Sequence, residues 1–190
     1  ELDAKVDEIT VDNGTVKSVT SNGKVFNCNE LIWANDVKYC YDLLDEEKPL
    51  LEKNLSTSGG VFYWGIDKEF PNIDLHNIFF SNDYQEEFDA IGNNKIPDDL
   101  TVYIHKASKV IPDMAPKGKE GWFVMVNLPA RDLTNSEKDS VRSGVIAKLS
   151  RTLKIDFSDH IVEEHTMFPQ DIESITGAFA GALYGQSSNF

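Results

Sequence analysis

Two Asn-Gly pairs, at positions 13–14 and 22–23, lie close together near the start of the chain. Asn-Gly is strongly preferred in two-residue hairpin turns, because both central residues must adopt positive φ. Apolar and polar residues alternate over residues 6–11 and 16–19, on either side of the first pair, and Val25 and Phe26 follow the second. The sequence therefore predicts a three-stranded β-meander.

A run of consecutive apolar residues, Leu-Ile-Trp-Ala, occupies positions 31–34 and is followed by Asn35 and Asp36. Such a run is typical of a strand that is covered on both faces. Asn or Asp at this place can cap a helix, and apolar residues then recur at helical spacing from Val37 to Leu44. We expect a strand that leads directly into a helix.

The remainder of the chain has five further strand candidates, at residues 61–66, 78–80, 100–105, 122–128 and 161–167. Two helices are expected between them. The shorter is capped by Asp83 and ends at Gly92, and the longer begins at a capping box formed by Thr134 and Glu137. The pattern predicts an α+β fold, in which helices pack on a mixed, largely antiparallel sheet of about five strands. The small N-terminal meander and its following strand stand beside this sheet.

The overall charge limits the partners of the protein. With 32 acidic and 18 basic residues, its formal net charge is −14, which repels phosphate backbones and argues against nucleic acid. For the same reason, any peripheral membrane contact is expected to be apolar. No apolar run reaches the about 18 residues that suggest a membrane-spanning helix. Cys28 and Cys40 have no disulfide or metal-site spacing, which predicts reduced thiols in a cytoplasmic protein.

The usual catalytic and metal-binding patterns are missing from the sequence. His160 and His165 are separated by a spacing that puts them on opposite faces of a strand, so no metal site is predicted. The chain has no Gly-x-Ser-x-Gly motif and no Gly-x-Gly-x-x-Gly loop of the kind that holds a dinucleotide pyrophosphate. The residues indicate no catalytic acid, base or nucleophile.

Two further features point to a binding site. Aromatic residues cluster on the predicted strands, and because the two faces of a strand cannot share one core, we expect some of them to face an apolar cavity. Gly177, Gly181 and Gly185 recur every four residues with mostly small residues between them. On a helix they would form a smooth stripe that admits another backbone or a flat ring, with tight helix packing as the alternative.

Several segments, taken in order over nearly the whole chain, resemble the bacterial phytoene desaturase family of the FAD-dependent amine oxidoreductase superfamily. The meander and the stretch at 30–36 are similar to a family strand that ends in Asn-Ala-Asp. Residues 61–67 resemble its aromatic Leu-Gly-Leu-Asp strand, and residues 100–118 its Ser-Leu-Tyr-Leu-His and Ala-Pro-x-Gly segments. Residues 168–189 resemble its Thr-Pro-x-Asp-Phe and Gly-Ala-x-Tyr-Gly segments, with Phe168 in place of the usual Thr.

The resemblance implies an internal fragment of a longer flavoprotein, with the main FAD-binding loop before Glu1. Residues 1–47 would be part of the FAD-binding domain, residues 48–176 the substrate-binding domain, and residues 177–190 the start of the return to the FAD domain. Two sets of site residues follow from it. The cofactor-binding set is Val6, Ala34, Asn35, Gly181 and Gly185, and the substrate-tunnel set is Phe62, Trp64, Tyr103, Phe179 and Tyr184.

By this resemblance, the full-length protein is expected to be an FAD-dependent oxidoreductase that desaturates a long carotenoid or isoprenoid chain. The isolated fragment is expected to be inactive. Its partner would be an apolar polyene, and the protein would be cytoplasmic or peripheral to the membrane. Three alternatives stay open: an amine oxidase, a polyprenol saturase, and a non-catalytic prenyl-binding protein of the same fold.

Overall fold

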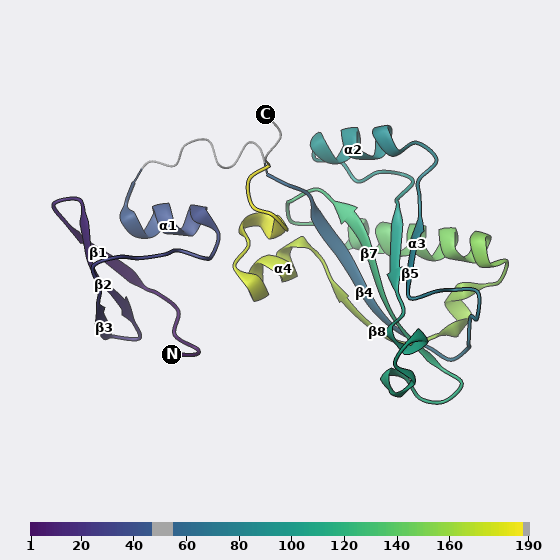
Figure 1. The fold of residues 1–190 in the computed structure, drawn as a ribbon. Helices are drawn as coiled ribbons and strands as arrows, with labels where there is room; N and C mark the ends of the chain where they lie inside the picture. The colour runs from purple at the N-terminus through teal and green to yellow at the C-terminus, as the bar shows by residue number, and fades with distance from the viewer. Residues whose placement is uncertain (47–54, 188–190) are drawn as a thin grey trace.

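The computed structural model describes residues 1–46 and 55–187. Figure 1 shows a small N-terminal unit and a larger unit built on a twisted sheet, with α4 (Pro169–Thr176) and the C-terminal segment between them. The predicted domain boundary between residues 47 and 48 lies outside the described residues, as do residues 188–190 at the end of the third predicted segment.

The N-terminal unit contains the predicted meander. Its strands β1 (Glu8–Asp12), β2 (Thr15–Ser21) and β3 (Lys24–Asn27) pair antiparallel in that order. The two turns between them have positive φ at both residues, with 50° at Asn13 and Asn22 and 73° and 74° at the glycines that follow. The Asn-Gly pairs thus form the hairpin turns for which they are preferred, and the prediction is confirmed.

The segment after the meander differs from its prediction. Residues 31–34 form no strand, and Ile32 is 92% exposed. No described strand pairs with this run, so its backbone groups take part in no ladder. The helix that follows is confirmed: α1 (Val37–Leu44) begins after Asp36, whose side chain accepts a hydrogen bond from the backbone N–H of Lys38.

The larger unit is built on a five-stranded sheet in the order β5-β6-β7-β4-β8. Every pairing in it is antiparallel, which confirms the α+β prediction. The strands are β4 (Ser58–Ile66), β5 (His76–Phe79), β6 (Val102–His105), β7 (Glu120–Leu128) and β8 (Ile161–Met167).

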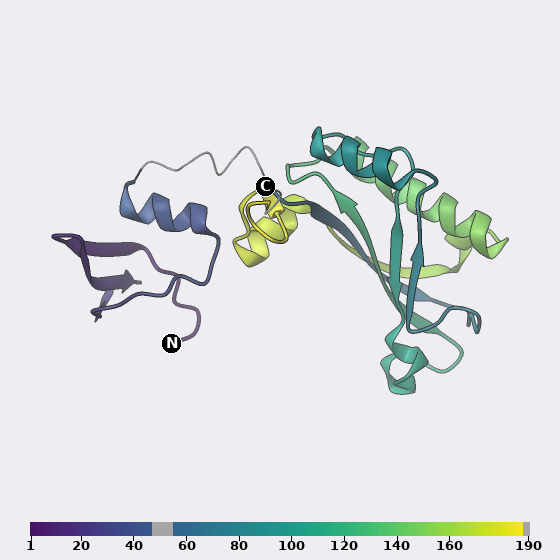
Figure 2. The same ribbon diagram turned by 45° about the horizontal axis from the view of Figure 1, so that its top comes forward.

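Helix α3 (Asn135–Leu153) covers one face of this sheet, as Figure 2 shows. The capping box of Thr134 and Glu137 is present at its start, as predicted. Its buried stripe packs in one core with the even-numbered residues of β4 and β7, which all point to the same face. This core includes Phe62, Trp64, Trp122, Val124, Val126, Val141, Val145 and Leu149.

Shorter elements complete the unit. Helix α2 (Tyr84–Gly92) is capped by Asp83 as predicted, and its buried Glu87 accepts hydrogen bonds from the hydroxyls of Ser81 and Thr101. The short helices η1 (Ala107–Lys109) and η2 (Pro112–Met114) lie between β6 and β7, and η3 (Phe157–His160) precedes β8. η4 (Phe179–Gly181) follows α4. No described helix is both long enough and apolar enough to cross a bilayer.

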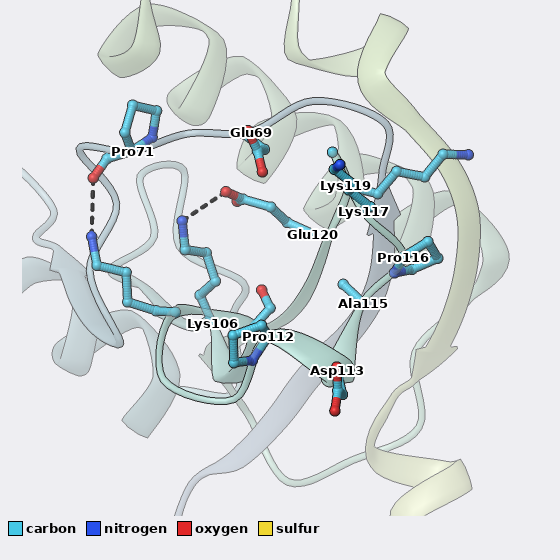
Figure 3. A pocket seen from close by; sticks show the side chains of 13 residues that line it. Glu69, Pro71, Lys106, Pro112, Asp113, Ala115, Pro116, Lys117, Lys119 and Glu120 are labelled. Atoms are coloured by element: carbon cyan, nitrogen blue, oxygen red, sulfur yellow. Dashed lines mark hydrogen bonds and ion pairs between the residues drawn. The ribbon is translucent and has the colours of Figure 1, made fainter.

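A buried ion pair closes one end of the sheet, at the base of the β6–β7 loop. Figure 3 shows Lys106 reaching Glu120, with 2.7 Å between Nζ and Oε1, and both side chains are at most 6% exposed. Glu120 also accepts hydrogen bonds from the backbone N–H of Phe70 and from the indole N–H of Trp122. Buried charges are tolerated only when they are paired and hydrogen-bonded, and both conditions are met here.

We predict that Glu120→Ala destabilises the chain by about 3–5 kcal/mol, because Lys106 would then be a buried charge without its counter-ion. The measurement is urea unfolding followed by tryptophan fluorescence. The double variant Lys106→Met with Glu120→Leu should recover part of the loss, since it leaves no buried charge.

The matched control is Arg142→Ala, which removes one partner of a more exposed ion pair with Glu164. Exposed pairs contribute within about 1 kcal/mol. A Glu120→Ala variant that unfolds no more readily than Arg142→Ala would contradict the role given to the buried pair.

Candidate functional site

A cavity of about 780 Å³ lies where the N-terminal unit meets α4. Four stretches of chain line it: the residues before β1, the 31–36 segment, α1, and α4 with the glycine after it. The volume falls within the roughly 300–1,000 Å³ that is usual for small-molecule and cofactor pockets. The wall of the cavity includes Val6, Ala34, Asn35, Tyr39, Glu173 and Gly177.

Asp36 joins the two sides of this cavity. One of its carboxylate oxygens caps α1, and the other accepts a hydrogen bond of 3.0 Å from the backbone N–H of Phe179. The ammonium of Lys38 lies 4.0 Å from the centre of the Phe179 ring, a cation–π contact in the same place. One helix cap therefore also fixes the C-terminal segment against the N-terminal unit.

A second polar contact joins α1 to α4. The Tyr39 hydroxyl donates a hydrogen bond of 2.8 Å to the carboxylate of Glu173. Burial raises the pKa of Tyr39 to about 12, and the hydrogen bond to Glu173 and its negative charge act in the same direction. The neutral phenol is therefore the form that the folded junction stabilises.

The glycine stripe was predicted on a helix, and this prediction is wrong. Gly177, Gly181 and Gly185 have φ of 72°, 70° and 65°, a left-handed conformation that ends or interrupts a helix. The expected close approach is nevertheless present at two of them. A Cβ on Gly177 would lie 2.9 Å from the amide nitrogen of Asn35, and one on Gly181 would lie 2.3 Å from the carbonyl oxygen of Pro169.

The predicted cofactor residues lie close together in space, with one exception. Val6, Ala34 and Asn35 line the main cavity. Ala34 and Asn35 also line a neighbouring pocket of about 520 Å³, whose wall includes Gly185. Gly181 lines neither of these two pockets, because it is buried against the start of α4.

The predicted tunnel residues lie in three different places. Phe62 and Trp64 are 0% and 2% exposed and fill the core under α3, because even-numbered residues of β4 face that helix. Tyr103 lies on the opposite face of the sheet. Phe179 packs against Lys38 at the junction, and Tyr184 is 83% exposed beside the neighbouring pocket.

The face of the sheet opposite α3, here called the open face, carries its own aromatic cluster. Tyr63 of β4 is 43% exposed, and its ring lies 5.5 Å from that of Phe123 on β7. Phe123 in turn lies 6.2 Å from Tyr103 on β6. His165 continues the row on β8, with its ring 6.0 Å from Tyr63. Four adjacent strands thus present one half-exposed aromatic row.

Sequence reasoning missed the residues that hold the junction together, namely Tyr39, Glu173 and the bridging role of Asp36. Tyr39 and Glu173 are 134 positions apart, and neither belongs to a motif. The helical spacing in α1 comes from Val37, Cys40, Tyr41 and Leu44, and it gave no indication of a partner for Tyr39. The identity of that partner depends on the tertiary fold.

We predict that the junction weakens in alkaline solution. Because the pKa of Tyr39 is raised from 10.0 to about 12, its contribution is fully present below pH 10 and is lost as the pH rises through 12. An ultraviolet phenolate titration of the Tyr39→Phe variant should lack the component that titrates near 12.

Glu173→Gln provides the matched test, because it removes the acceptor's charge and keeps the side chain's shape. It should move the high component of the titration down toward the ordinary tyrosine range. If both variants titrate like the unaltered chain, Tyr39 is not held by Glu173.

Comparison with known proteins shows relatives over almost the whole chain. A 1-hydroxycarotenoid 3,4-desaturase from a Flavobacterium species is 40% identical over 97% of this chain. A 4,4'-diapolycopene oxygenase from a Methylomonas species is 31% identical over 97%, and a zeta-carotene-forming phytoene desaturase from Myxococcus xanthus is 28% identical over 98%. The chain spans only 37–39% of the length of these relatives. No family model matches.

The fold has a counterpart among solved structures. A crystal structure of an oxidoreductase from Methanosarcina mazei superposes with a TM-score of 0.54 and 10% sequence identity, covering 86% of this chain and 36% of that one. This likeness concerns the fold, whereas the curated relatives match in sequence. The curated relatives and the ordered motifs described above establish that the chain belongs to the carotenoid and phytoene desaturase family of FAD-dependent oxidoreductases. It corresponds to a part of such a protein.

Proposed function

We propose that this chain is the substrate-binding part of an FAD-dependent oxidoreductase that desaturates a long carotenoid or isoprenoid chain. The observation that carries the proposal is the 40% identity to a carotenoid desaturase over 97% of the chain. The two structural features described above, the cavity at the junction and the aromatic open face, supply places for a cofactor and for an apolar substrate.

The junction cavity fits part of an FAD molecule. Its volume suits a ligand of that class, and the close packing of Asn35 against Gly177 holds the Asn35 amide in the cavity wall. Val6, Ala34 and Asn35 would contact the cofactor, and Asn35 would offer an amide as hydrogen-bond donor or acceptor. When bound, FAD would supply the capacity to accept a hydride.

The open face fits one wall of a polyene site. Tyr63, Tyr103 and Phe123 present ring surface on neighbouring strands, and a polyene can lie across such rings without any ionisable partner. This moves the proposed wall from Phe62 and Trp64, which fill the core, to their neighbours on the other face. Tyr103 is the tunnel residue that keeps its predicted role.

The protein's role in the reaction would then be orientation and the exclusion of water. Within residues 1–46 and 55–187, no group of three or more His, Cys, Asp or Glu gathers in a way that could hold a metal. The substrate-binding role also requires the FAD-binding residues found elsewhere in the family, so we propose that the isolated chain is inactive. A cytoplasmic protein at the membrane surface would meet a carotenoid where it dissolves.

The amine oxidase and polyprenol saturase alternatives would place a different substrate against the same aromatic wall. A non-catalytic prenyl-binding protein would use the wall without a flavin. The names of the relatives favour a desaturase or an oxygenase over all three alternatives.

We predict that the full-length protein takes up FAD and acquires flavin absorbance, whereas the 190-residue chain mixed with FAD stays colourless. The difference is expected because FAD needs the dinucleotide loop for its pyrophosphate. Absorbance after gel filtration measures the uptake. A full-length protein that retains no FAD would exclude the desaturase and favour the prenyl-binding alternative.

We also predict that Phe123→Ala in the full-length protein lowers kcat/KM for a carotenoid substrate by about tenfold. This factor corresponds to the free energy gained when one aromatic side chain is buried against the substrate. Phytoene and 1-hydroxycarotenoids are the first substrates to try. Tyr84→Ala, which removes a half-exposed ring from α2, is the matched control and should leave kcat/KM unchanged. Equal effects of the two variants would contradict the open-face site.

A further inference from the structure

The loop between β6 and β7, residues 107–119, combines exposed apolar and basic side chains. Val110, Ile111 and Met114 are 64%, 55% and 60% exposed, and they lie together around η1 and η2. Lys109, Lys117 and Lys119 are exposed on the same loop. In Figures 1 and 2 the loop is the teal-green segment that projects from the lower end of the sheet.

The local charge of this loop opposes that of the whole chain. Residues 107–119 contain three lysines and one aspartate, a net charge of +2, in a chain of net charge −14. Lys106 is not counted, because it is neutralised by Glu120 in the buried pair below the loop. Exposed lysines on the same loop as exposed apolar side chains are complementary to an anionic lipid surface, in which apolar chains lie beneath negatively charged headgroups.

The backbone of the loop is suited to an apolar interface. The N–H groups of Val110, Ile111, Met114 and Ala115 all donate to carbonyls within the loop. Pro112 and Pro116 have no N–H group to satisfy. Backbone groups that leave water must find partners within the protein, and these four N–H groups have such partners.

The loop is also held rigidly to the rest of the protein. The Lys109 ammonium donates a hydrogen bond of 3.1 Å to the carbonyl of Pro71, drawn as a dashed line in Figure 3. The loop folds back over the sheet, with the carbonyl oxygen of Met114 3.6 Å from where a Cβ on Gly121 would lie. Gly121 is on the open face of β7, so the loop stands at one end of the open face.

We propose that residues 107–119 form a membrane anchor, in which Val110, Ile111 and Met114 enter the interface of a bilayer and the lysines bind anionic phospholipid headgroups. The proposal rests on the proposed function, because a polyene substrate gives the protein a reason to bind a membrane. The chemistry of the contact with lipid comes from the loop's own side chains. In this proposal the bilayer lies at the end of the open face that is farthest from α4. A polyene dissolved in the lipid would enter the open face at that end, and the junction cavity lies toward the other end.

The experiment is vesicle flotation of the full-length protein and of the 190-residue chain. Vesicles of phosphatidylcholine with phosphatidylglycerol are compared with vesicles of phosphatidylcholine alone. The unaltered proteins should float with the anionic vesicles, and added salt should weaken the binding because it screens the lysines. Failure to float with anionic vesicles would overturn the proposal.

Two variants separate the two parts of the anchor. Ile111→Ser with Met114→Ser should lower the vesicle partition coefficient by about tenfold or more, because it removes the inserted apolar surface. Lys117→Gln with Lys119→Gln should lower it by about fivefold for each lysine, and only on anionic vesicles. All four side chains are exposed, so an unchanged urea midpoint shows that the fold is intact.

The matched control combines Val25→Ser on β3 with Lys95→Gln after α2. Both side chains are exposed and lie outside the loop, so this variant should float like the unaltered protein. An equal loss in the control and in the loop variants would overturn the proposal. So would concentration-dependent dimers, seen by sedimentation, that the Ile111→Ser and Met114→Ser changes abolish.

FAD uptake by the same full-length variants keeps the two proposals apart. A protein that takes up FAD but does not float retains the proposed function and loses the anchor. One that floats but takes up no FAD retains the anchor and loses the proposed function. The loop variants should take up FAD like the unaltered protein, because the loop lies away from the junction cavity.

Discussion

The five-stranded sheet is covered by α3 on one face only, and the rest of the structure depends on this. Successive residues of a strand point to opposite faces, so each central strand sends one set of side chains to the core and the other set to the uncovered side. In β4, Phe62 and Trp64 pack under α3, while Tyr63 between them is 43% exposed. The protein thus keeps a stable core and, on the same strands, an aromatic surface available for a ligand.

The two proposed sites lie at opposite ends of this surface. The junction cavity is built from the N-terminal unit and α4, where Asp36 and the Tyr39–Glu173 hydrogen bond hold the two parts together. The loop at residues 107–119 stands at the other end, above the buried pair of Lys106 and Glu120. A strand of nine residues such as β4 spans about 30 Å. The proposed polyene would therefore have about this length of strand to lie along on the open face.

The loop also shows why a net charge is a poor guide to a surface. A chain of net charge −14 suggested that any membrane contact would be apolar alone. The fold leaves Lys109, Lys117 and Lys119 exposed on the same loop as three exposed apolar side chains, and it neutralises Lys106 internally. Over a distance of about 10 Å at physiological salt, the local charges outweigh the distant ones, because the field of the remainder is screened.

The sequence by itself determined the elements whose signals are local. The Asn-Gly turns and the caps at Asp36, Asp83 and Thr134 depend on neighbouring residues, and all are as predicted. Val6, Ala34 and Asn35, which the resemblance names as cofactor-binding, line one cavity, and their role stays a prediction. Two predictions were wrong. Residues 31–34 form no strand because none pairs with them, and the glycines at 177, 181 and 185 make turns where a regular helix was expected.

Only the tertiary structure decided which face of the sheet is open and which residues meet across the junction. Alternation shows that Phe62 and Tyr63 point apart, but the position of α3 decides which of them is buried. Tyr39 and Glu173 are joined by a hydrogen bond that no periodicity in either helix could indicate. Such contacts join residues far apart in the chain, and their geometry exists only once the intervening segments have packed.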